Sequence, residues 1–386
     1  MKISEKKQKN ILIINCDWRN IFEAGWEEFY KKLERDRLEP DKHNFFFFSW
    51  STASYRKKRD ERFETIHIKT RFKFFRPFLD LMSTISVPYM VRISRFHPDI
   101  VLVYDFGFIP AAFIVKIFYG AKLILCLTNM PQAYSATRSF GRIKSVYSFF
   151  VERAFVKLVD VGYTINQAMK SYIIGIGLPG KKVVVFASDT IKRDMKHINA
   201  SSKGRIRSRY GISENQKIIL SVGRLEMEKG FPRLLDVFSK LDQSYILIIL
   251  GQGSLRGALE EKARYLGIDK RVIFTGFVDR KNIWDYYRDA DVFMLLSNVE
   301  ALGLVFWEAM YMGVPAIGST APGIVESLGR RNERGIVIEP NASFEDILEK
   351  IKFCITPSRE REAMLINAER FVEREISNTT SISDVI

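Results

Sequence analysis

The sequence has no long uninterrupted apolar segment. A helix that crosses a bilayer needs about 18 or more apolar residues in succession, and no stretch of the 386 residues provides them. The best candidate, residues 100–119, is interrupted by Asp105, Gly107, Pro110 and Lys116. We therefore expect no membrane-spanning helix.

The sequence is also poor in cysteine. Its three cysteines, Cys16, Cys126 and Cys354, are far apart and set in apolar runs, which favours buried reduced thiols over disulfides or a metal site. The first ten residues, MKISEKKQKN, run directly into the strand-like ILIIN without the longer apolar core and cleavage site of a signal peptide. Both features lead us to expect a cytoplasmic protein.

Acidic residues are scarce in the first half alone. Residues 1–200 hold 34 Lys and Arg against 19 Asp and Glu, whereas residues 201–386 hold 26 of each. This asymmetry suggests that the first half meets an anionic partner such as a phospholipid surface, a phosphorylated acceptor or nucleic acid. The alternative is an ordinary solvated basic surface.

What the sequence does contain is a regular alternation of apolar strands and helical stretches. Near-continuous apolar strands indicate parallel sheets covered on both faces, so the chain is predicted to be α/β with two doubly wound domains. We place the first domain at residues 1–195, the second at 205–358, and a charged helix and tail at 359–386, with a polar linker near 190–205. The strands are predicted in ILIIN, NFFFF, ETIHI, DIVLVY, AKLILCL, DVGYTI and KKVVVF, and then in KIILSV, YILIIL, RVIF, DVFMLL, VPAIG and GIVI.

Four successive strands of the second half are followed by loops that carry glycine or charge. Ligands of open parallel sheets bind beyond the carboxyl ends of the strands. In GRLEMEKG, the cations of Arg224 and Lys229 are suited to neutralise a diphosphate. GQG at residues 251–253 allows close approach of a nucleotide or makes a helix-entry turn, and TGFV at residues 275–278 lies against a base or is a plain strand exit.

The segment SNVEALGLVFWEAMYMGVPAIGST places two carboxylates eight positions apart. Glu300 is predicted in a loop and Glu308 inside a helix that opens near Gly303 and stops near Gly313. The first amides of such a helix bind anions. Bulky apolar neighbours predict a partly buried carboxylate at Glu308, which then needs partners such as sugar hydroxyls.

These segments together resemble a known family. SVGRLEMEKGF, VIFTGFV, ADVFMLLSNVEALGLVFWEAMYMGVPAIGS and APGIVE are similar to the C-terminal domain of the retaining glycosyltransferase family 4, also called glycosyltransferase group 1. The resemblance covers residues 216–340 and is looser over the first half. It implies the GT-B fold, in which two Rossmann-like domains have parallel sheets that face each other across a cleft. The C-terminal domain then holds a nucleotide sugar, and the N-terminal domain holds most of the acceptor.

The resemblance also implies roles for individual residues. Glu300, Arg224 and Lys229 form the catalytic group, in which the two cations bind the diphosphate and Glu300 meets the donor sugar. Glu308 binds the ribose. The donor site as a whole is expected to include Gly223, Gly251, Phe277, Val278, Ala301, Leu302, Gly303, Leu304 and Glu308.

The acceptor side departs from the family pattern. Many relatives have a Gly-Gly pair where this chain has Ala24-Gly25, and a His after the fifth strand where this chain has LTNMPQAYS with Asn129. Gly25 and Asn129 are the acceptor-side candidates, and the departures admit a weak or specialised enzyme.

The resemblance predicts a retaining transfer of a hexose from a UDP- or GDP-sugar to a glycan or lipid-linked acceptor, in cell-surface polysaccharide or glycolipid synthesis. Fixed cations and helix amides stabilise the departing diphosphate, so no metal or other cofactor is expected. The alternatives are a nucleotide-sugar epimerase of the same fold and a non-catalytic protein that binds nucleotide sugars or anionic polymers.

The basic and aromatic segment at residues 69–99 bears on the partner. On a helix it is suited to rest at an anionic membrane surface, which predicts a peripheral location on the inner face of the cell membrane. A packed connector with solvated cations is an equally good account. No RRM, KH or zinc-knuckle motif accompanies it, so we expect no nucleic-acid partner.

Overall fold

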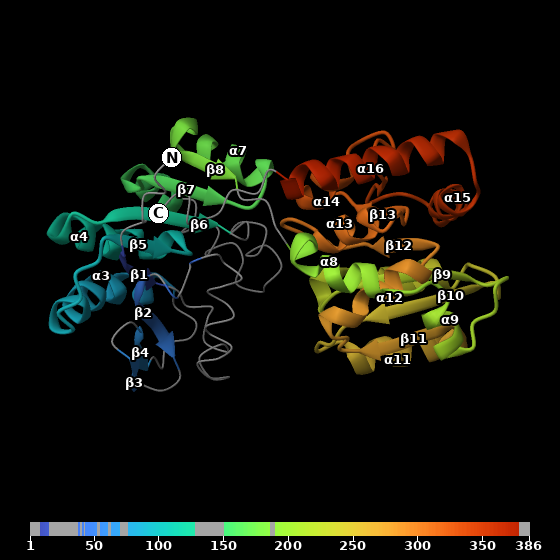
Figure 1. Ribbon diagram of the computed structural model, residues 1–386, viewed down its shortest axis with the longest axis horizontal. Coiled ribbons are helices and arrows are strands. Elements are labelled where there is room, and N and C mark those ends of the chain that lie inside the picture. The colour runs from blue at the N-terminus through green and yellow to red at the C-terminus, as the bar shows by residue number, and fades with distance from the viewer. Residues whose placement is uncertain are drawn as a thin grey trace. The chain divides into compact units, whose positions relative to one another are not determined.

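The computed structural model describes residues 8–14, 38, 41, 43–51, 55–60, 63–69, 76–127, 150–185 and 190–377. The chain divides into two compact units, one of residues Met1–Phe186 with Thr380–Ile386 and one of residues Ala187–Thr379 (Figure 1). Each unit contains a twisted sheet with helices, as the alternation of strands and helices predicts.

The first unit has an eight-stranded sheet in the order β3-β4-β2-β1-β5-β6-β7-β8. Seven strands are parallel and follow the predicted apolar runs, whose side chains form a buried core in the described part. Their bounds are β1 Asn10–Ile14, β2 Asn44–Ser51, β4 Phe63–Lys69, β5 Ile100–Val103, β6 Lys122–Leu127, β7 Val161–Thr164 and β8 Val183–Val185.

One edge of this sheet differs from the expected parallel arrangement. Strand β3, Tyr55–Asp60, runs antiparallel to β4 at the sheet edge. Its sequence YRKKRD carries almost no apolar residue, so the pattern of apolar runs does not predict this strand. An edge strand forms backbone hydrogen bonds on one side only, and charged side chains there discourage pairing with another chain.

Two described helices of the first unit pack against each other. They are α3, Arg76–Ile93, and α4, Ile109–Tyr119. Helix α4 begins with Pro110 in its first turn and ends at Gly120, whose left-handed conformation closes the helix. The other elements described here are the 3₁₀ turns η1 Phe106–Phe108, η2 Val156–Leu158 and η3 Gly180–Lys182, and helix α7 Gln167–Gly175.

The second unit has a six-stranded parallel sheet in the order β11-β10-β9-β12-β13-β14. The order reverses between β9 and β12, and this switch point is where open α/β sheets bind ligands. The strands are β9 Lys217–Val222, β10 Tyr245–Leu250, β11 Val272–Gly276, β12 Val292–Leu295, β13 Ala316–Ser319 and β14 Ile336–Ile338. All six predicted strands of this half are confirmed.

The predicted linker is helical instead. Residues 190–205 contain α8, Thr190–Ala200, and the start of α9, Arg205–Tyr210, and both belong to the second unit. The polar composition concealed three buried isoleucines, Ile191, Ile198 and Ile206, that join the core of that unit. The division between the units falls after Phe186, a few residues before the predicted linker.

The terminal helix also belongs to the second unit. Helix α16, Arg359–Ser377, packs on α13, Leu304–Tyr311, and buries Met364, Ala368 and Val372 in the same core. Residues 359–377 are therefore not a separate segment. The remaining helices are α10 Phe231–Phe238, α11 Arg256–Tyr265, α12 Ile283–Asp289, α14 Pro322–Leu328 and α15 Phe344–Ile355, with the 3₁₀ turns η4 Met227–Lys229, η5 Asp269–Arg271 and η6 Arg280–Asn282.

Candidate functional site

The four predicted strand-end loops of the second unit meet at the carboxyl edge of its sheet. The Gly223 amide donates to the Leu250 carbonyl at 3.0 Å, and the Gly251 amide donates to the Gly276 carbonyl at 2.9 Å. These bonds join the ends of β9, β10 and β11. Glycine is required at position 251, because φ is +145° there and a Cβ would collide with the Gly223 carbonyl. That glycine therefore serves the contact between two loops of the protein.

The loop after β9 also contacts the loop after β12, across the switch point. The Asn298 amide donates to the Glu228 carbonyl at 2.7 Å. Gly230 has φ +69°, and a Cβ at this position would collide with the Leu296 carbonyl. One of these loops carries the residues predicted to bind the diphosphate and the other carries the residue predicted to bind the sugar. Backbone contacts thus fix the two loops to each other.

Lys229 and Glu300 form an ion pair at this point. The Lys229 Nζ lies 2.7 Å from Glu300 Oε2, and the two side chains are 15% and 14% exposed. Two residues 71 positions apart in the sequence, predicted to bind the diphosphate and the donor sugar, therefore face one another. An ammonium group is suited to a negative group of a ligand, and a carboxylate is suited to accept hydrogen bonds from ligand hydroxyls.

Arg224 lies in the same loop with much greater freedom. Its side chain is 66% exposed and its Nη2 lies 3.0 Å from Glu228 Oε1. An exposed ion pair contributes little to stability, so the arginine can exchange this partner for a phosphate at low cost. Arg224 and Lys229 are therefore on one loop, but only Lys229 is held in place.

Helix α13 begins directly after the Lys229–Glu300 pair. Its N-cap is Gly303, with φ +72°, and the helix starts at Leu304 as predicted. The first amides of a helix have no intrahelical acceptors, so the backbone at Leu304 and Val305 offers donors and the positive end of the helix dipole. Ala301 and Leu302 form the short connection from Glu300 to this helix and are partly exposed.

Glu308 differs from its prediction. It is 1% exposed rather than partly exposed, and both carboxylate oxygens have protein partners. Arg280 Nη1 lies 2.6 Å from Oε1, and the Tyr287 hydroxyl donates to Oε2 at 2.7 Å. Burial raises the pKa of Glu308, and the positive charge of Arg280 opposes that shift. A ribose hydroxyl that contacts Glu308 would share these oxygens with Arg280 and Tyr287, because a carboxylate oxygen can accept two hydrogen bonds.

Arg280 connects this buried carboxylate to helix α8. Its Nε lies 2.7 Å from Asp194 Oδ2, and its guanidinium lies over the Trp284 ring at 5.4 Å. Burial lowers the pKa of Arg280, but the carboxylates of Glu308 and Asp194 outweigh this effect and the net shift is upward. Arg280, Tyr287 and Asp194 are not among the site residues that the sequence predicts. The position of Arg280, directly after the strand-end segment TGFVD, is the feature of the sequence that could have indicated it.

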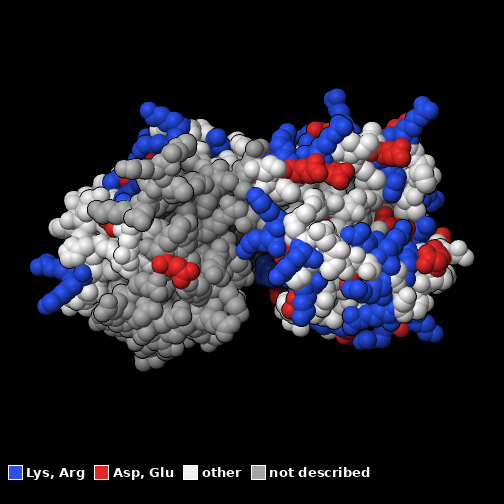
Figure 2. All heavy atoms as spheres, viewed as in Figure 1, with Lys and Arg blue, Asp and Glu red and all other residues white. Residues whose placement is uncertain are grey.

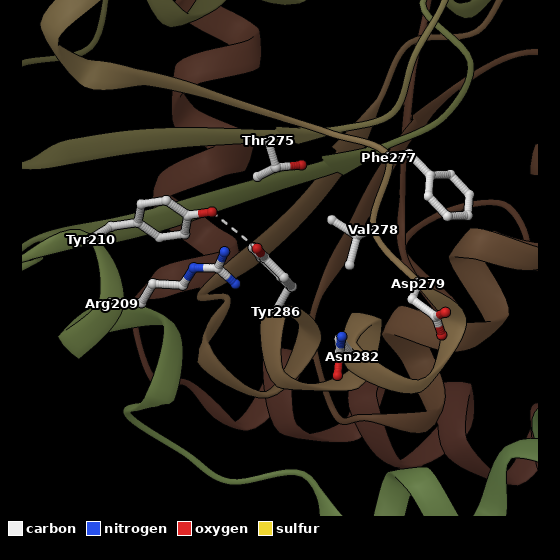
Figure 3. A pocket seen from close by; sticks show the side chains of 8 residues that line it. All are labelled: Arg209, Tyr210, Thr275, Phe277, Val278, Asp279, Asn282 and Tyr286. Carbon is white, nitrogen blue, oxygen red and sulfur yellow. Dashed lines mark hydrogen bonds between the residues drawn. The ribbon is translucent and has the colours of Figure 1, made fainter.

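The TGFV segment lines a cavity of about 160 Å³ in the second unit (Figure 3). Val278 lies along its wall, whereas the Phe277 side chain is 73% exposed at its edge. Tyr210 and Tyr286 share a hydrogen bond of 3.0 Å between their hydroxyls on another side. The other lining residues are Arg209, Thr275, Asp279 and Asn282. Apolar and polar groups thus occur together at a predicted base-binding segment.

The predicted acceptor-side residues belong to the part of the chain that the structure does not describe. Gly25 and Asn129 lie outside the described residues, as does Cys16. The other two cysteines, Cys126 and Cys354, are buried, as expected.

Comparisons with known proteins point to one family. Residues 202–371 match the family model described as Glycosyl transferases group 1. The chain is 30% identical over 145 residues to an alpha-monoglucosyldiacylglycerol synthase of Streptococcus pneumoniae, a match that covers 37% of this chain and 33% of the relative. The first curated relatives that it matches are covered over less than two thirds of their own length.

Solved structures match the chain over almost its whole length. A sucrose-phosphate synthase from Thermosynechococcus elongatus superimposes with a TM-score of 0.72 at 16% identity and covers 95% of both chains. HepE of Anabaena, in complex with UDP and glucose, superimposes with a TM-score of 0.68 at 15% identity and covers 98% of this chain and 99% of its own. These likenesses confirm the predicted GT-B fold.

Proposed function

We propose that the protein is a retaining glycosyltransferase of family 4, from the match of residues 202–371 to the family model Glycosyl transferases group 1. Its donor is a UDP- or GDP-sugar, and its acceptor is a glycan or a lipid-linked sugar in cell-surface polysaccharide or glycolipid synthesis. The observation that carries the proposal is the Lys229–Glu300 pair at the switch point of the sheet, next to the start of α13.

In this proposal the donor diphosphate replaces Glu300 as the partner of Lys229. Arg224 turns from Glu228 to the same diphosphate, and the first amides of α13 donate to its oxygens. Three positive groups then stabilise the charge that develops on the leaving group without a metal ion or other cofactor. Glu300, released from the lysine, accepts hydrogen bonds from hydroxyls of the donor sugar.

The transfer breaks the bond between the anomeric carbon and the diphosphate oxygen. The acceptor hydroxyl forms the new bond to that carbon on the face that the diphosphate leaves, and its proton goes to a phosphate oxygen. The configuration at the anomeric carbon is retained and no protein base is needed. The carboxylate of Glu300, fixed beside the sugar, stabilises the positive charge of the ring in the transition state.

Relatives support the choice of substrates. One solved structure of the same fold holds UDP and glucose, and one curated relative is named for a glycolipid product. These two names support a uridine diphosphate sugar and a lipid-linked acceptor, and a guanosine diphosphate sugar is the alternative donor that we propose from the sequence resemblance. A cytoplasmic enzyme on the inner face of the membrane suits both substrates, because the donor is soluble and the acceptor is lipid-bound.

A two-stage experiment tests the proposal. The first stage screens UDP, GDP and their sugars for thermal stabilisation, since a ligand that binds only the folded form raises the melting temperature. The second stage incubates the stabilising donor, labelled in its sugar, with lipid extract and follows label into the lipid fraction. Transfer is the expected result. Stabilisation by no nucleotide, or release of an epimerised nucleotide sugar without acceptor, would overturn the proposal.

A further inference from the structure

Helix α3 is apolar on two opposite faces. Val87 and Val91 are fully buried against the rest of the first unit. On the other side Met82, Ile85, Tyr89 and Ile93 follow one another at intervals of three or four residues and are exposed, Ile85 by 68% and Tyr89 by 62%. Such intervals place the four side chains in one stripe. A surface helix normally has a polar outer face, so this stripe indicates a partner.

Helix α4 adds two more exposed apolar side chains at the same end of the first unit. Ile117 is 64% and Phe118 is 76% exposed. The His97 ring, just beyond α3, lies edge-on to the Tyr119 ring at a centroid distance of 5.4 Å, so the ends of α3 and α4 adjoin. The outer patch, as we call it, consists of Met82, Ile85, Tyr89, Ile93, Ile117 and Phe118.

Basic residues border the outer patch. Arg92 and Arg95 are exposed at the end of α3, next to Ile93. In Figure 2 the edge of the molecule over α3 and α4 is mainly uncharged, with basic side chains projecting from it. The surrounding half of the sequence carries the entire positive excess of the chain. An apolar surface with a basic border is complementary to a bilayer that contains anionic lipid.

We propose that the outer patch docks the protein on an anionic lipid bilayer. The helices lie on the membrane: no helix among the described residues is long and apolar enough to cross it. The six apolar side chains enter the boundary between headgroups and acyl chains, and Arg92 and Arg95 meet lipid phosphates. Tyr89 suits this depth, because its ring is apolar and its hydroxyl is polar.

Charge favours a bilayer over a second copy of the chain. A symmetric dimer through the outer patch would bring the arginines of two equally basic units together, whereas anionic headgroups neutralise them. The biological reason for docking rests on the proposed function, since a lipid-linked acceptor is found only at a membrane. The surface itself is defined by exposure and charge alone.

The test is flotation with two kinds of vesicle. One kind is pure phosphatidylcholine, and in the other about 30% of the lipid is the anionic phosphatidylglycerol. Wild-type protein is expected to float with the anionic vesicles. The fourfold variant Ile85→Gln, Tyr89→Gln, Ile117→Gln, Phe118→Gln keeps the charge and should partition at least about tenfold less strongly. Arg92→Gln with Arg95→Gln should weaken binding about tenfold at low salt and reduce its salt dependence.

The matched control removes exposed apolar side chains from the second unit. Tyr265→Gln with Ile366→Gln should float like wild type, because both residues are exposed outside the outer patch. All variants replace surface residues, so unchanged melting temperatures verify folding. Failure of wild type to float, or equal flotation of the fourfold variant, would overturn the proposal. A wild-type dimer that the fourfold variant dissociates, without any flotation, would assign the outer patch to a second copy.

Thermal stabilisation by nucleotide separates this proposal from the proposed function. Loss of flotation with nucleotide stabilisation intact removes only the bilayer contact. Flotation without any nucleotide stabilisation removes only the transferase assignment.

Discussion

The two units share a doubly wound sheet but differ in where their unusual residues lie. In the second unit they gather in loops at the carboxyl edge of the sheet, where Lys229 pairs with Glu300. In the first unit the described unusual residues are apolar side chains on the outer faces of α3 and α4. Residues 201–386 are balanced in charge, and residues 1–200 are strongly basic. One architecture therefore supports two kinds of contact, because function depends on the residues added to the fold.

Each unit also buries a glutamate that accepts a hydrogen bond from a tyrosine. Glu308 of the second unit has Tyr287 and, in addition, the cation of Arg280. Glu152 of the first unit is bonded by Tyr172, and burial raises its pKa. Burial raises the pKa of both carboxyl groups; at Glu308 the positive charge of Arg280 opposes this shift, whereas at Glu152 the hydrogen bond from Tyr172 opposes it.

The largest effect is expected from Glu300→Gln. The change keeps the shape of the side chain but removes the negative charge that we place beside the sugar, so transfer should fall by about 10²–10³-fold. Nucleotide affinity should stay the same or rise, because Lys229 loses a competing partner. Turnover and nucleotide binding measured on the same preparation check this. Unchanged turnover would contradict the catalytic role of Glu300 and of the loops at the carboxyl edge of the second sheet.

Lys229→Met should weaken binding of the nucleoside diphosphate about 10-fold to 100-fold, since hydrogen bonds to charged groups contribute about 1.5–3 kcal/mol. Titration calorimetry with UDP and GDP measures the change. Lys270→Met is the matched control, because Lys270 is exposed in the same unit away from the site loops. Equal affinities of the two variants would contradict the role of Lys229.

Arg280→Met should destabilise the second unit by about 2 kcal/mol, because it leaves the buried Glu308 carboxylate without its cation; the partial exposure of Arg280 makes this less than for a fully buried pair. Urea unfolding measures the loss. Adding Glu308→Gln should restore part of it, which a double-mutant cycle detects. Strictly additive losses would show that the two side chains act separately.

The smallest effect concerns the pH dependence of the first unit. Because burial raises the pKa of Glu152 above its ordinary value of 4.5, its contribution to stability is present below that value and is lost as the pH rises through the higher folded value. Glu152→Gln should therefore gain stability relative to wild type as the pH rises through this range. Melting temperatures of both proteins across the range provide the measurement.

Asp160 is the control of opposite sign. Burial acts to raise its pKa, but hydrogen bonds from Lys116 and from the Leu123 amide outweigh burial and the net shift is downward from 3.8. Its contribution is thus present above pH 3.8 and is lost as the pH falls through the lower folded value. The stability of Asp160→Asn should therefore be lower than that of wild type above pH 3.8 and should approach it only in acid. If the stability difference from wild type changed with pH in the same direction for Glu152→Gln and Asp160→Asn, the opposite roles of the two carboxyl groups would be contradicted.

Much of the fold could be predicted because parallel strands are apolar along their whole length. Runs such as KIILSV and YILIIL have no other stable place than a sheet covered on both faces. Strand β3 could not be found this way, since YRKKRD at a sheet edge contributes little to a core. Residues 190–205 read as a linker in the sequence, because the isoleucines there are widely spaced among charged residues, whereas the structure forms α8 and the start of α9.

The site could be predicted in part. The strand-end rule and the family resemblance selected Arg224, Lys229 and Glu300, and the structure brings their loops together. The role of Arg280 could not be inferred, because its carboxylate partners, Asp194 and Glu308, lie on different helices. A pattern of neighbours along the chain does not contain such contacts.

The sequence by itself determined the class of fold, the positions of the parallel strands and the loops that follow them, because burial of apolar runs and the turn preferences of glycine are local properties of the chain. Only the tertiary structure decided which charged groups pair, how deeply Glu308 is buried and which apolar side chains of α3 and α4 face solvent. Those outcomes depend on distances between segments far apart in the sequence, and electrostatic and hydrophobic energies depend on those distances.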